Sequence, residues 1–416
     1  MKQLLIFIFS FMYMASVAQN VQTELEKIVT DNKLMGLTVF TFNGKNEKTF
    51  NIGLRNEAQK LPITNETVFR IASISKSLAA LGLLKLYDQK KFKLDDDVSK
   101  ALGFKLRNPN FPDTPITFRM IFSHTSSIVD GSGYDKFLSA TYKEMPITPI
   151  SSVLVSGGSN YTSDMWLNKK PGTYFTYCNL NFGLLGTLIE KLSNERFDIY
   201  IRREILQPLK INSGFNIQDV PNINDVAVLY RKEKELWTPQ KDDFKGIKPQ
   251  ATDLSTYAIG TNGAYFGPQG GLRCSAQDLG KFLKFIKSDG KSASKIITKK
   301  TLLEAKKQQW IFVKDNGDNY DGFFKSYGLG LHQTNTSTTD RMGEPKIFGK
   351  FVGHAGDAYG LISDAYVSTK QNFGFVLITN GCYGPFVKGK TTAFYKFEEE
   401  IIALLIADFH RNNLKK

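Results

Sequence analysis

The sequence predicts a mixed α/β (α+β) protein. A central antiparallel sheet, flanked by helices, is built from the N- and C-terminal segments, and a mostly helical domain is inserted between them. Strand-like runs occur near both ends, in GLTVFTFNGKNEKTFNIGLRN and, after residue 252, in YGLGLHQT, GLISDAYVS and NFGFVLITNG. Between them, short helical patterns alternate with loops that contain Pro and Gly. We therefore assign residues 19–93 and 252–416 to the α/β sheet domain and residues 94–251 to the helical domain.

Each element follows from the spacing of its apolar residues. VQTELEKIVTDNKL has helical spacing, and the two strands after it flank an Asn-Gly turn. ISKSLAALGLLKLYDQKK repeats Ala and Leu at positions three and four apart, which is the clearest helical pattern in the chain. LNFGLLGTLIEKLSNERFDIYIRREIL is a long amphipathic stretch of the helical domain, and TTAFYKFEEEIIALLIADFH predicts a closing helix.

The first 18 residues are typical of a secretory signal peptide. A basic start is followed by the apolar run LLIFIFSFMYMASVA, which ends in small residues. This run is shorter than the ~20 residues that a bilayer span needs, and later apolar runs are broken by Lys, Asp and Gly. We expect cleavage near Ala18, a secreted or periplasmic mature protein, and no stable membrane span.

The composition argues against several classes of partner. The net charge of +14 comes mainly from Lys residues scattered among acids, without a basic stripe or a known nucleic-acid motif. We therefore expect no nucleic-acid partner, although weak attraction to an acidic cell-wall polymer stays open. Cys178, Cys274 and Cys382 leave at most one disulfide open, and with four His they offer no metal-ligand spacing. We expect no metal and no other cofactor, and the oligomeric state is not indicated.

A serine and a lysine stand together at the start of the clearest helix. Ser73 and Lys76 are three residues apart, so their side chains share one helical face. An alcohol nucleophile needs a base, and a lysine becomes one when burial or nearby positive charge lowers its pKa. The helix N-terminus adds N–H groups beside a developing oxyanion. By itself the pattern is also compatible with an ordinary serine in a first helical turn.

Two later segments carry polar groups suited to the same chemistry. Tyr177 and Asn179 lie in a loop before a helix, where a phenol can shuttle protons and an amide can orient a carbonyl. A buried aromatic and a helix N-cap are the structural alternatives. His354 and Gly356 precede a strand-like run, so a titratable donor lies beside a backbone that a substrate can approach closely.

Together and in this order, these segments resemble the serine β-lactamase-related superfamily. This group includes class C β-lactamases, D-alanyl-D-alanine carboxypeptidases, and related esterases and peptidases. FRIASISKSLAALGLLKL, KPGTYFTYCNLNFGLLGTLIEKLS and VGHAGDAYGLISDAYV resemble its three motifs. ITFRMIFSHTSSI and PQGGLRCSAQDLGKFLKFI resemble two further signature stretches. The resemblance implies the β-lactamase/penicillin-binding-protein fold, with the active site between the two domains.

The resemblance also implies catalytic roles. Ser73 is expected to attack a carbonyl and form an acyl-enzyme, while Lys76 and Tyr177 manage its proton. Asn179 is expected to hold the substrate amide. Backbone N–H groups of Ser73 and Asp357 are expected to form the oxyanion hole, as in other acyl-transfer enzymes.

Some positions depart from the common pattern of the superfamily. His354 stands where β-lactamases have Lys, so we do not expect strong β-lactamase activity. The resemblance implies that His354, near Gly356, offers a hydrogen-bond donor to a substrate carboxylate. We interpret Cys178 and Cys274 as small buried residues rather than reactive thiols. His124 is expected to have a structural hydrogen-bonding role.

The motifs predict a serine hydrolase but do not select one substrate. Secretion favours a D-Ala-D-Ala carboxypeptidase-like or D-amino-acid peptidase activity, with cell-wall peptides as one candidate substrate. A β-lactamase and a carboxylesterase remain alternatives within the superfamily. A non-catalytic penicillin-binding or envelope-binding protein is the alternative outside the enzymes, and the joint presence of Ser73, Lys76, Tyr177 and Asn179 argues against it.

Overall fold

The computed structural model describes residues 21–289, 296–384 and 386–413, so the predicted signal peptide lies outside the described residues. A nine-stranded sheet forms its centre, and every pair of neighbouring strands in it is antiparallel. In spatial order the strands are β3 (Leu61–Pro62), β2 (Asn46–Asn56), β1 (Gly36–Asn43), β13 (Phe373–Thr379), β12 (Leu361–Ser368), β11 (Phe351–Ala358), β10 (His332–Thr334), β9 (Ser326–Tyr327) and β8 (Trp310–Ile311). The predicted mixture of a central antiparallel sheet and helices is confirmed.

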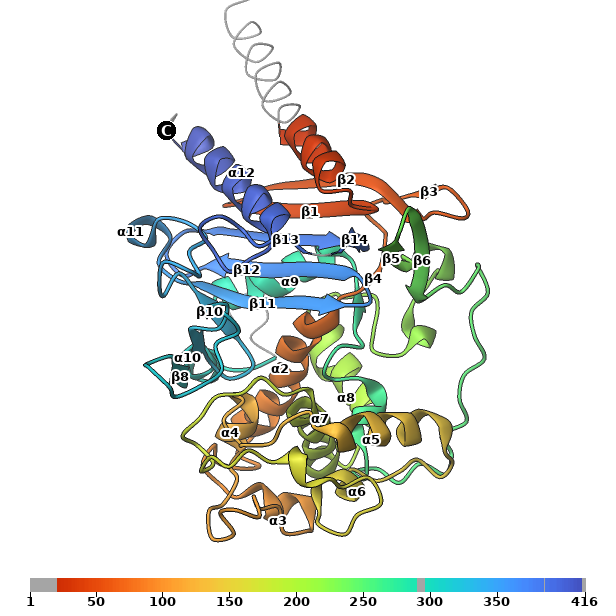
Figure 1. Ribbon diagram of the computed structural model, residues 1–416, viewed down its shortest axis with the longest axis vertical. Helices are drawn as coiled ribbons and strands as arrows, with labels where there is room; N and C mark the ends of the chain where they lie inside the picture. The colour runs from red at the N-terminus through yellow and green to blue at the C-terminus, as the bar shows by residue number, and fades with distance from the viewer. Residues whose placement is uncertain (1–20, 290–295, 385, 414–416) are drawn as a thin grey trace, which may run out of the picture.

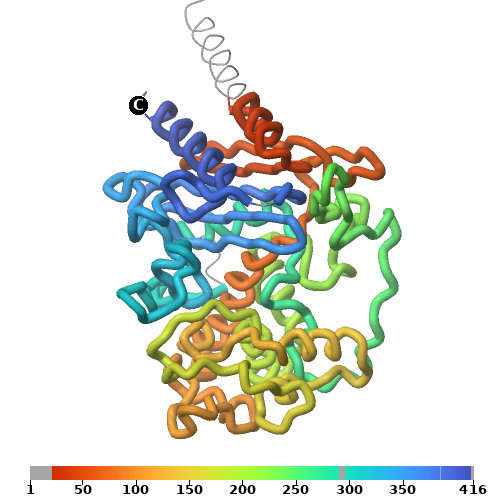
Figure 2. Tube along the Cα trace, viewed as in Figure 1, coloured from red at the N-terminus to blue at the C-terminus, as the bar shows by residue number. Residues whose placement is uncertain are grey.

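The two ends of the chain meet in this sheet. β1 pairs with β13, with Leu37 opposite Thr379 and Phe40 opposite Val376. Both strands are buried along nearly their whole length, which explains their almost continuous apolar sequences. Figures 1 and 2 show the N-terminal segment (red) and the C-terminal segment (blue) side by side at this end of the molecule.

Helices cover both faces of the sheet. The helix of residues 21–31 and α12 (Lys396–Asn413) pack on one face, where their apolar side chains join those of β1 and β13. α9 (Ala276–Lys287) packs on the other face (Figure 1). The sequence predicted the closing helix, and its apolar stripe is what buries the first face.

Below the sheet lies a layer of helices around α2 (Ser75–Asp88) (Figure 1). This layer contains α3 (Val98–Leu102), α4 (Phe118–Phe122), α5 (Ser132–Lys143), α6 (Ser151–Leu154), α7 (Asn179–Ser193) and α8 (Phe197–Ile201). α2 is buried on all sides except near its C-terminus, because Ala, Leu and Gly fill nearly every turn. At Gly82 an added Cβ would lie 2.2 Å from Ile201, so glycine lets α8 approach α2 closely.

Short elements complete the fold. They are α10 (Lys299–Ala305), α11 (Pro345–Phe348), the sheet of β14 (Gly381–Tyr383), β5 (Leu229–Glu233) and β6 (Leu236–Lys241), and the pair β4 (Phe69–Arg70) and β7 (Arg273–Cys274). Among the described residues, no helix combines the length and the apolar character that crossing a membrane requires.

Three expectations about local structure differ from the fold. The long amphipathic stretch after Leu180 is not one helix: α7 ends at Ser193, and Asn194 adopts a left-handed conformation with φ of 55° before α8 begins. YGLGLHQT forms β9 and β10 rather than one strand, with Gly330 at φ of 70° between them. The β5–β6 hairpin was not predicted within the helical range, because two buried residues, Leu229 and Tyr230, are followed by mostly polar residues that show no clear alternation.

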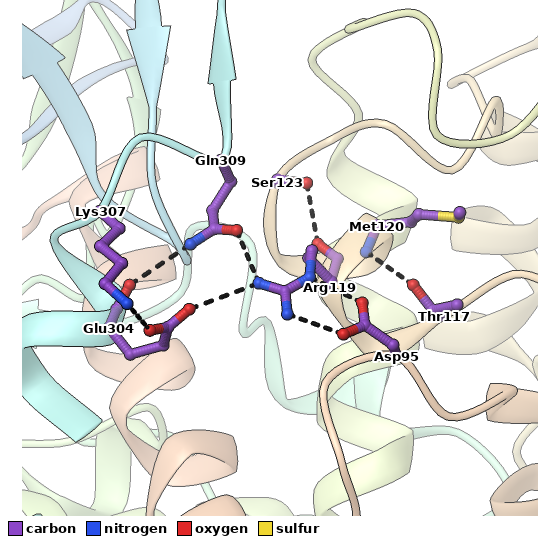
Figure 3. A network of polar contacts seen from close by, with 8 residues as sticks. All are labelled: Asp95, Thr117, Arg119, Met120, Ser123, Glu304, Lys307 and Gln309. Carbon is purple, nitrogen blue, oxygen red and sulfur yellow. Dashed lines mark hydrogen bonds and ion pairs between the residues drawn. The ribbon is translucent and has the colours of Figure 1, made fainter. Parts of the chain in front are cut away.

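A polar network fastens α4 to the region around α10 and β8 (Figure 3). Arg119 donates from Nε and Nη2 to the two carboxylate oxygens of Asp95, at 2.7 and 2.8 Å. Its Nη1 donates to Gln309 at 2.7 Å and lies 3.5 Å from Glu304. One guanidinium thus connects the helical layer with a segment that leads into the sheet.

We expect Arg119→Ala to lower the free energy of unfolding by about 1 kcal/mol, because a bidentate but partly exposed ion pair contributes modestly. Chemical denaturation measures this change. Lys307→Ala is the matched control, since Lys307 is 66% exposed and contacts only Glu304 of the same network. Equal stability of the two variants would contradict a fastening role for Arg119.

Candidate active site

The predicted nucleophile lies in a strained turn at the start of α2. Ser73 occupies the 3-10 turn η1 (Ala72–Ile74), which runs directly into the helix. Ala72 has φ of 48°, a left-handed conformation that is uncommon for a residue with a side chain. Such strain persists only where the surrounding structure enforces it, and it is concentrated at functional sites.

Lys76 is held directly beside this serine. Its Nζ lies 2.9 Å from Ser73 Oγ, 2.8 Å from Asn179 Oδ1 and 2.7 Å from the carbonyl oxygen of Gln269. The side chain is fully buried. Burial lowers the pKa of Lys76 to about 7, although the negative charge of Asp130 opposes this shift. A large fraction of the amine is therefore neutral near pH 7 and can accept a proton from Ser73.

Tyr177 stands over the lysine, and its ring centroid lies 4.8 Å from Lys76 Nζ. Burial raises the pKa of the phenol far above its ordinary value, more than the nearby Ser73 hydroxyl lowers it. The phenol is therefore protonated at neutral pH. Within the described residues its hydroxyl makes no hydrogen bond of ordinary geometry, which leaves it available as a donor. In these states Lys76 can act as a base and Tyr177 as a proton donor.

Asn179 is the first residue of α7, and Asp130 fixes it in place. The Asp130 carboxylate accepts the backbone N–H groups of Asn179 at 2.7 Å and Leu180 at 2.9 Å, and the Asn179 side-chain amide at 2.9 Å. It therefore caps α7 from another segment, because the side chain of Cys178 at the N-cap makes no capping hydrogen bond. Asn179 in turn presents Oδ1 to Lys76.

His354 also reaches this site, but both of its ring nitrogens are engaged. Nδ1 lies 2.6 Å from the carbonyl oxygen of Ala355, which can only accept, so Nδ1 carries the proton. Nε2 then accepts from the Tyr327 hydroxyl at 2.8 Å. Burial, followed by the charge of Lys76, lowers the pKa of His354 well below its usual value. The imidazole is thus neutral, and its predicted contact with a substrate carboxylate would require one of these bonds to open.

β11 presents a free edge next to Ser73. It pairs with β10 only through Phe351, Val352 and Gly353, so among the described residues 354–358 have no strand partner on that edge. An added Cβ at Gly356 would lie 2.7 Å from the carbonyl oxygen of Ile71 and 3.0 Å from Ala72. Glycine at this position therefore lets the strand lie directly against the nucleophile turn.

A cavity of about 400 Å³ opens over these groups. Its wall includes five of the seven predicted site residues, whereas Lys76 and Asn179 are not part of its lining. The lining consists of Ser73, Tyr177, Tyr320, Asp321, Phe323, Phe324, His354, Ala355, Gly356, Asp357, Ile362, Lys388, Ala393, Tyr395 and Glu398. Among the described residues, no group of three or more His, Cys, Asp or Glu side chains could hold a metal ion.

The geometry is thus that of a serine nucleophile with a buried amine base at the mouth of a cavity. Residues 19–395 match the family model described as Beta-lactamase. The chain belongs to the Beta-lactamase family. The predicted family resemblance is thereby confirmed, and the family together with the site geometry supports the predicted class of serine hydrolase.

The chain is also similar to a curated relative and to solved structures of the same fold. The chain is 27% identical over 227 residues to "Protein flp" of Staphylococcus aureus (strain MRSA252), a match that covers 54% of this chain and 44% of that protein. It is similar in structure to the octameric penicillin-binding protein homologue from Pyrococcus abyssi, with a TM-score of 0.68, 24% identity, and coverage of 94% of this chain and 77% of that one. The D-amino acid amidase from Ochrobactrum anthropi SV3, complexed with L-phenylalanine amide, gives a TM-score of 0.67 at 18% identity, covering 96% and 100%. The match to the curated relative spans less than half of its length.

Other residues of this Beta-lactamase family protein pack against the site residues. His124 accepts the backbone N–H of Cys178 at 3.1 Å, and its ring lies 4.5 Å from that of Tyr177, as a structural role requires. Cys178, Cys274 and Cys382 are free and buried, and burial raises the pKa of each thiol.

The sequence reasoning missed several groups of the site. Asp130 follows the SHTSSI stretch but gave no spacing signal, and the Gln269 carbonyl is a backbone group that no residue pattern reveals. Glu398 lies on α12, where it belongs to the helical pattern, yet it lines the cavity. It contacts Asp364, and burial raises the pKa of both carboxyls.

We expect the rate of acylation to rise with pH through a midpoint near 7 and then to level off, because only the neutral amine of Lys76 can accept the serine proton. A pH profile of kcat/KM for a neutral ester measures this. Lys76→Met should lower kcat/KM by about 10²–10⁴-fold, the usual contribution of a positioned base. A wild-type profile without a midpoint between pH 6 and about 8 would contradict this assignment.

We expect Asp130→Asn to lower kcat/KM and to destabilise the fold by about 1 kcal/mol, because an amide cannot accept all three N–H groups that the carboxylate accepts. Kinetics and thermal unfolding measure the two effects. Asp135→Asn is the control, since Asp135 lies in α5, outside both the cavity lining and the contacts of Lys76. Unchanged kinetics in Asp130→Asn would show that Asn179 needs no such support.

Proposed function

We propose that this hydrolase is an amidase or peptidase that acts on D-amino-acid amides or short D-amino-acid peptides through an acyl-enzyme on Ser73. The observation that carries the proposal is the contact of 2.9 Å between Ser73 Oγ and Lys76 Nζ, whose pKa lies at about 7. This pair can form an alkoxide-like nucleophile at neutral pH without any other base.

The proposed reaction uses the groups in sequence. Neutral Lys76 accepts the hydroxyl proton as Ser73 Oγ bonds to the carbonyl carbon, and the carbonyl oxygen becomes an oxyanion. Backbone N–H groups of Ser73 and Asp357 stabilise that charge. The tetrahedral intermediate collapses, the C–N bond breaks, and the leaving nitrogen receives a proton from the Lys76 ammonium, with Tyr177 as a neighbouring donor. Water then repeats these steps on the acyl-enzyme and releases the acid.

The polar groups of the cavity wall support an amino-group-bearing substrate over one with a terminal carboxylate. His354 is neutral and both of its nitrogens are engaged. Lys388, a cation of the lining, is paired with Asp321 at 2.7 Å. In contrast, Glu398 and Asp357 line the wall, and although burial raises the pKa of both carboxyl groups, their oxygens can accept hydrogen bonds from a substrate amine.

The D configuration and the place of action rest on different support. A protein of the same fold is a D-amino acid amidase, which shows that this architecture can carry such an activity. The signal-like N-terminal sequence supports secretion to the periplasm or beyond, where cell-wall peptides supply D-amino acids. A D-Ala-D-Ala-type peptide therefore belongs to the same proposal.

A carboxylesterase is the second candidate, and the aromatic wall favours it. Phe324 stacks on Tyr177 with ring centroids 5.0 Å apart, and Tyr320 and Phe323 continue the surface. Such a wall suits an apolar acyl or leaving group.

We expect intact-protein mass spectrometry and product analysis to show acyl transfer in the wild type and none in Ser73→Ala. The panel contains D-phenylalanine amide, L-phenylalanine amide, a D-Ala-D-Ala peptide, a penicillin and a p-nitrophenyl ester. D-phenylalanine amide should be turned over fastest among the amides. Ser75→Ala is the matched control, because its hydroxyl accepts the backbone N–H of Leu272 and does not contact Lys76.

The panel also separates the candidates. Turnover of the ester alone would favour the carboxylesterase. Preference for the L-amide would contradict the proposed substrate class, and equal product formation by Ser73→Ala would contradict the nucleophile.

A further inference from the structure

A second cavity, of about 590 Å³, is larger than the one over Ser73 and contains none of the residues assigned to catalysis. It lies among β4, β6, β7 and the segments around them. Its wall combines cations, one buried carboxylate and several aromatic rings. The lining includes Arg70, Tyr142, Phe215, Lys241, Asp242, Asp243, Phe244, Tyr265, Phe266 and Arg273.

Two arginines share one carboxylate in this wall. Asp242 accepts from Arg273 at 2.9 and 2.8 Å, and from Arg70 at 3.3 and 3.0 Å. Their side chains are only 6% and 16% exposed. The triad therefore carries one positive charge in excess in a poorly hydrated place. Among the described residues, Nη1 of each guanidinium has no hydrogen-bond partner, so both arginines retain donors for a further acceptor.

A lysine adds to this excess. Lys241 lines the cavity, and within the described part of the chain it has no carboxylate or hydrogen-bond partner. Burial lowers the pKa of Lys241, and the charges of Arg70 and Arg273 lower it further, while Asp242 opposes the shift. Lys241 and Asp243, the second acid of the wall, are both exposed to solvent, and Asp243 does not join the triad.

The rest of the wall is aromatic. The Phe244 ring lies 5.8 Å from the Arg273 guanidinium, and Tyr265 lies 5.8 Å from Tyr142 and 5.2 Å from Phe266. Offset and edge contacts with such rings stabilise a flat ring in a ligand. Unpaired cationic donors beside aromatic faces are therefore complementary to a ring that carries an acidic group.

The cavity shares two chain segments with the catalytic centre. Arg70 precedes Ser73 by three residues, and it pairs with Arg273 between β4 and β7. The segment from Phe266 to Arg273 includes Gln269, whose carbonyl oxygen accepts from Lys76. A ligand in this cavity would therefore contact the two chain segments that carry Ser73 and Gln269.

We propose that this second cavity binds an anionic ring compound, of which an aromatic carboxylate is the simplest form. The carboxylate contacts Arg70, Arg273 and Lys241, and the ring lies among Phe244, Tyr265 and Tyr142. The anion can belong to a remote part of the substrate or to a separate small molecule. The proposal does not depend on the amide or ester bond that the enzyme cleaves.

Calorimetric titration of the Ser73→Ala full chain with sodium benzoate tests the binding itself, free of turnover. We expect benzoate to bind and benzamide, its uncharged analogue, not to bind measurably. Lys241→Gln should raise the benzoate Kd by at least about fivefold, which corresponds to losing one charge-assisted contact of about 1 kcal/mol. Lys245→Gln, four residues after Lys241 in the chain but outside the lining, is the matched control and should leave the Kd unchanged.

A crystal soaked with 4-bromobenzoate locates the ligand independently of any variant, since the anomalous signal of bromine should lie among Phe244, Tyr265 and Tyr142. Absence of benzoate binding, equal affinity for benzamide, or a bromine peak only elsewhere would overturn the proposal. So would an unchanged Kd in Lys241→Gln.

The two sources of the anion are distinguished in the wild type. Competitive inhibition of ester hydrolysis by benzoate would assign the cavity to a remote anionic group of the substrate. Binding without competition would assign it to a separate ligand. Both results support an anion site, and the Ser73→Ala titration remains decisive even if no substrate of the panel is turned over.

Discussion

The burial of the Lys76 amine is the interaction on which the rest of the site depends. Its three polar contacts come from three parts of the chain: Ser73 in the turn before α2, Asn179 at the start of α7, and the Gln269 carbonyl before β7. A lysine can be held dry only if each of its N–H groups finds an acceptor. The helical layer and the segment that leads into β7 must therefore pack closely at this one point, and this packing also positions the nucleophile.

That burial favours catalysis at a cost in stability. The pKa of Lys76 is near 7 in the folded chain and near 10.4 in an unfolded chain, so between these values the unfolded state binds more protons. Stability contributed by this group therefore rises with pH across that window and is lower below pH 7, the opposite of a lysine that gains an ion pair. The left-handed Ala72 adds strain at the same turn. The continuous apolar contacts of α2 and the sheet offset both terms.

Much of the architecture could be predicted because the spacing of apolar residues within each segment indicates its secondary structure. The hairpin of β1 and β2, the strands β12 and β13, and the helices α2 and α12 all follow from apolar spacing and turn residues. The three-residue spacing of Ser73 and Lys76 likewise predicted the contact between their side chains. Asp130 could not be found in this way, since its partner Asn179 lies 49 residues away and only tertiary packing brings them together. The break at Asn194 was missed for a local reason, because its left-handed conformation interrupts an otherwise helical pattern.

His354 shows how a correctly located residue can have an electrostatic state that its sequence context does not give. The motif placed a titratable ring beside the nucleophile, but the Ala355 carbonyl and the Tyr327 hydroxyl determine that it is a neutral imidazole protonated on Nδ1. Because the ring is neutral, the site does not bury a second positive charge beside the Lys76 amine. Under the proposed function, contacts with a polar substrate group fall instead to the cavity wall, where Glu398 and Asp357 offer carboxyl oxygens as acceptors. The position of a residue in a motif therefore does not give its charge, because neighbours from other segments of the chain determine it.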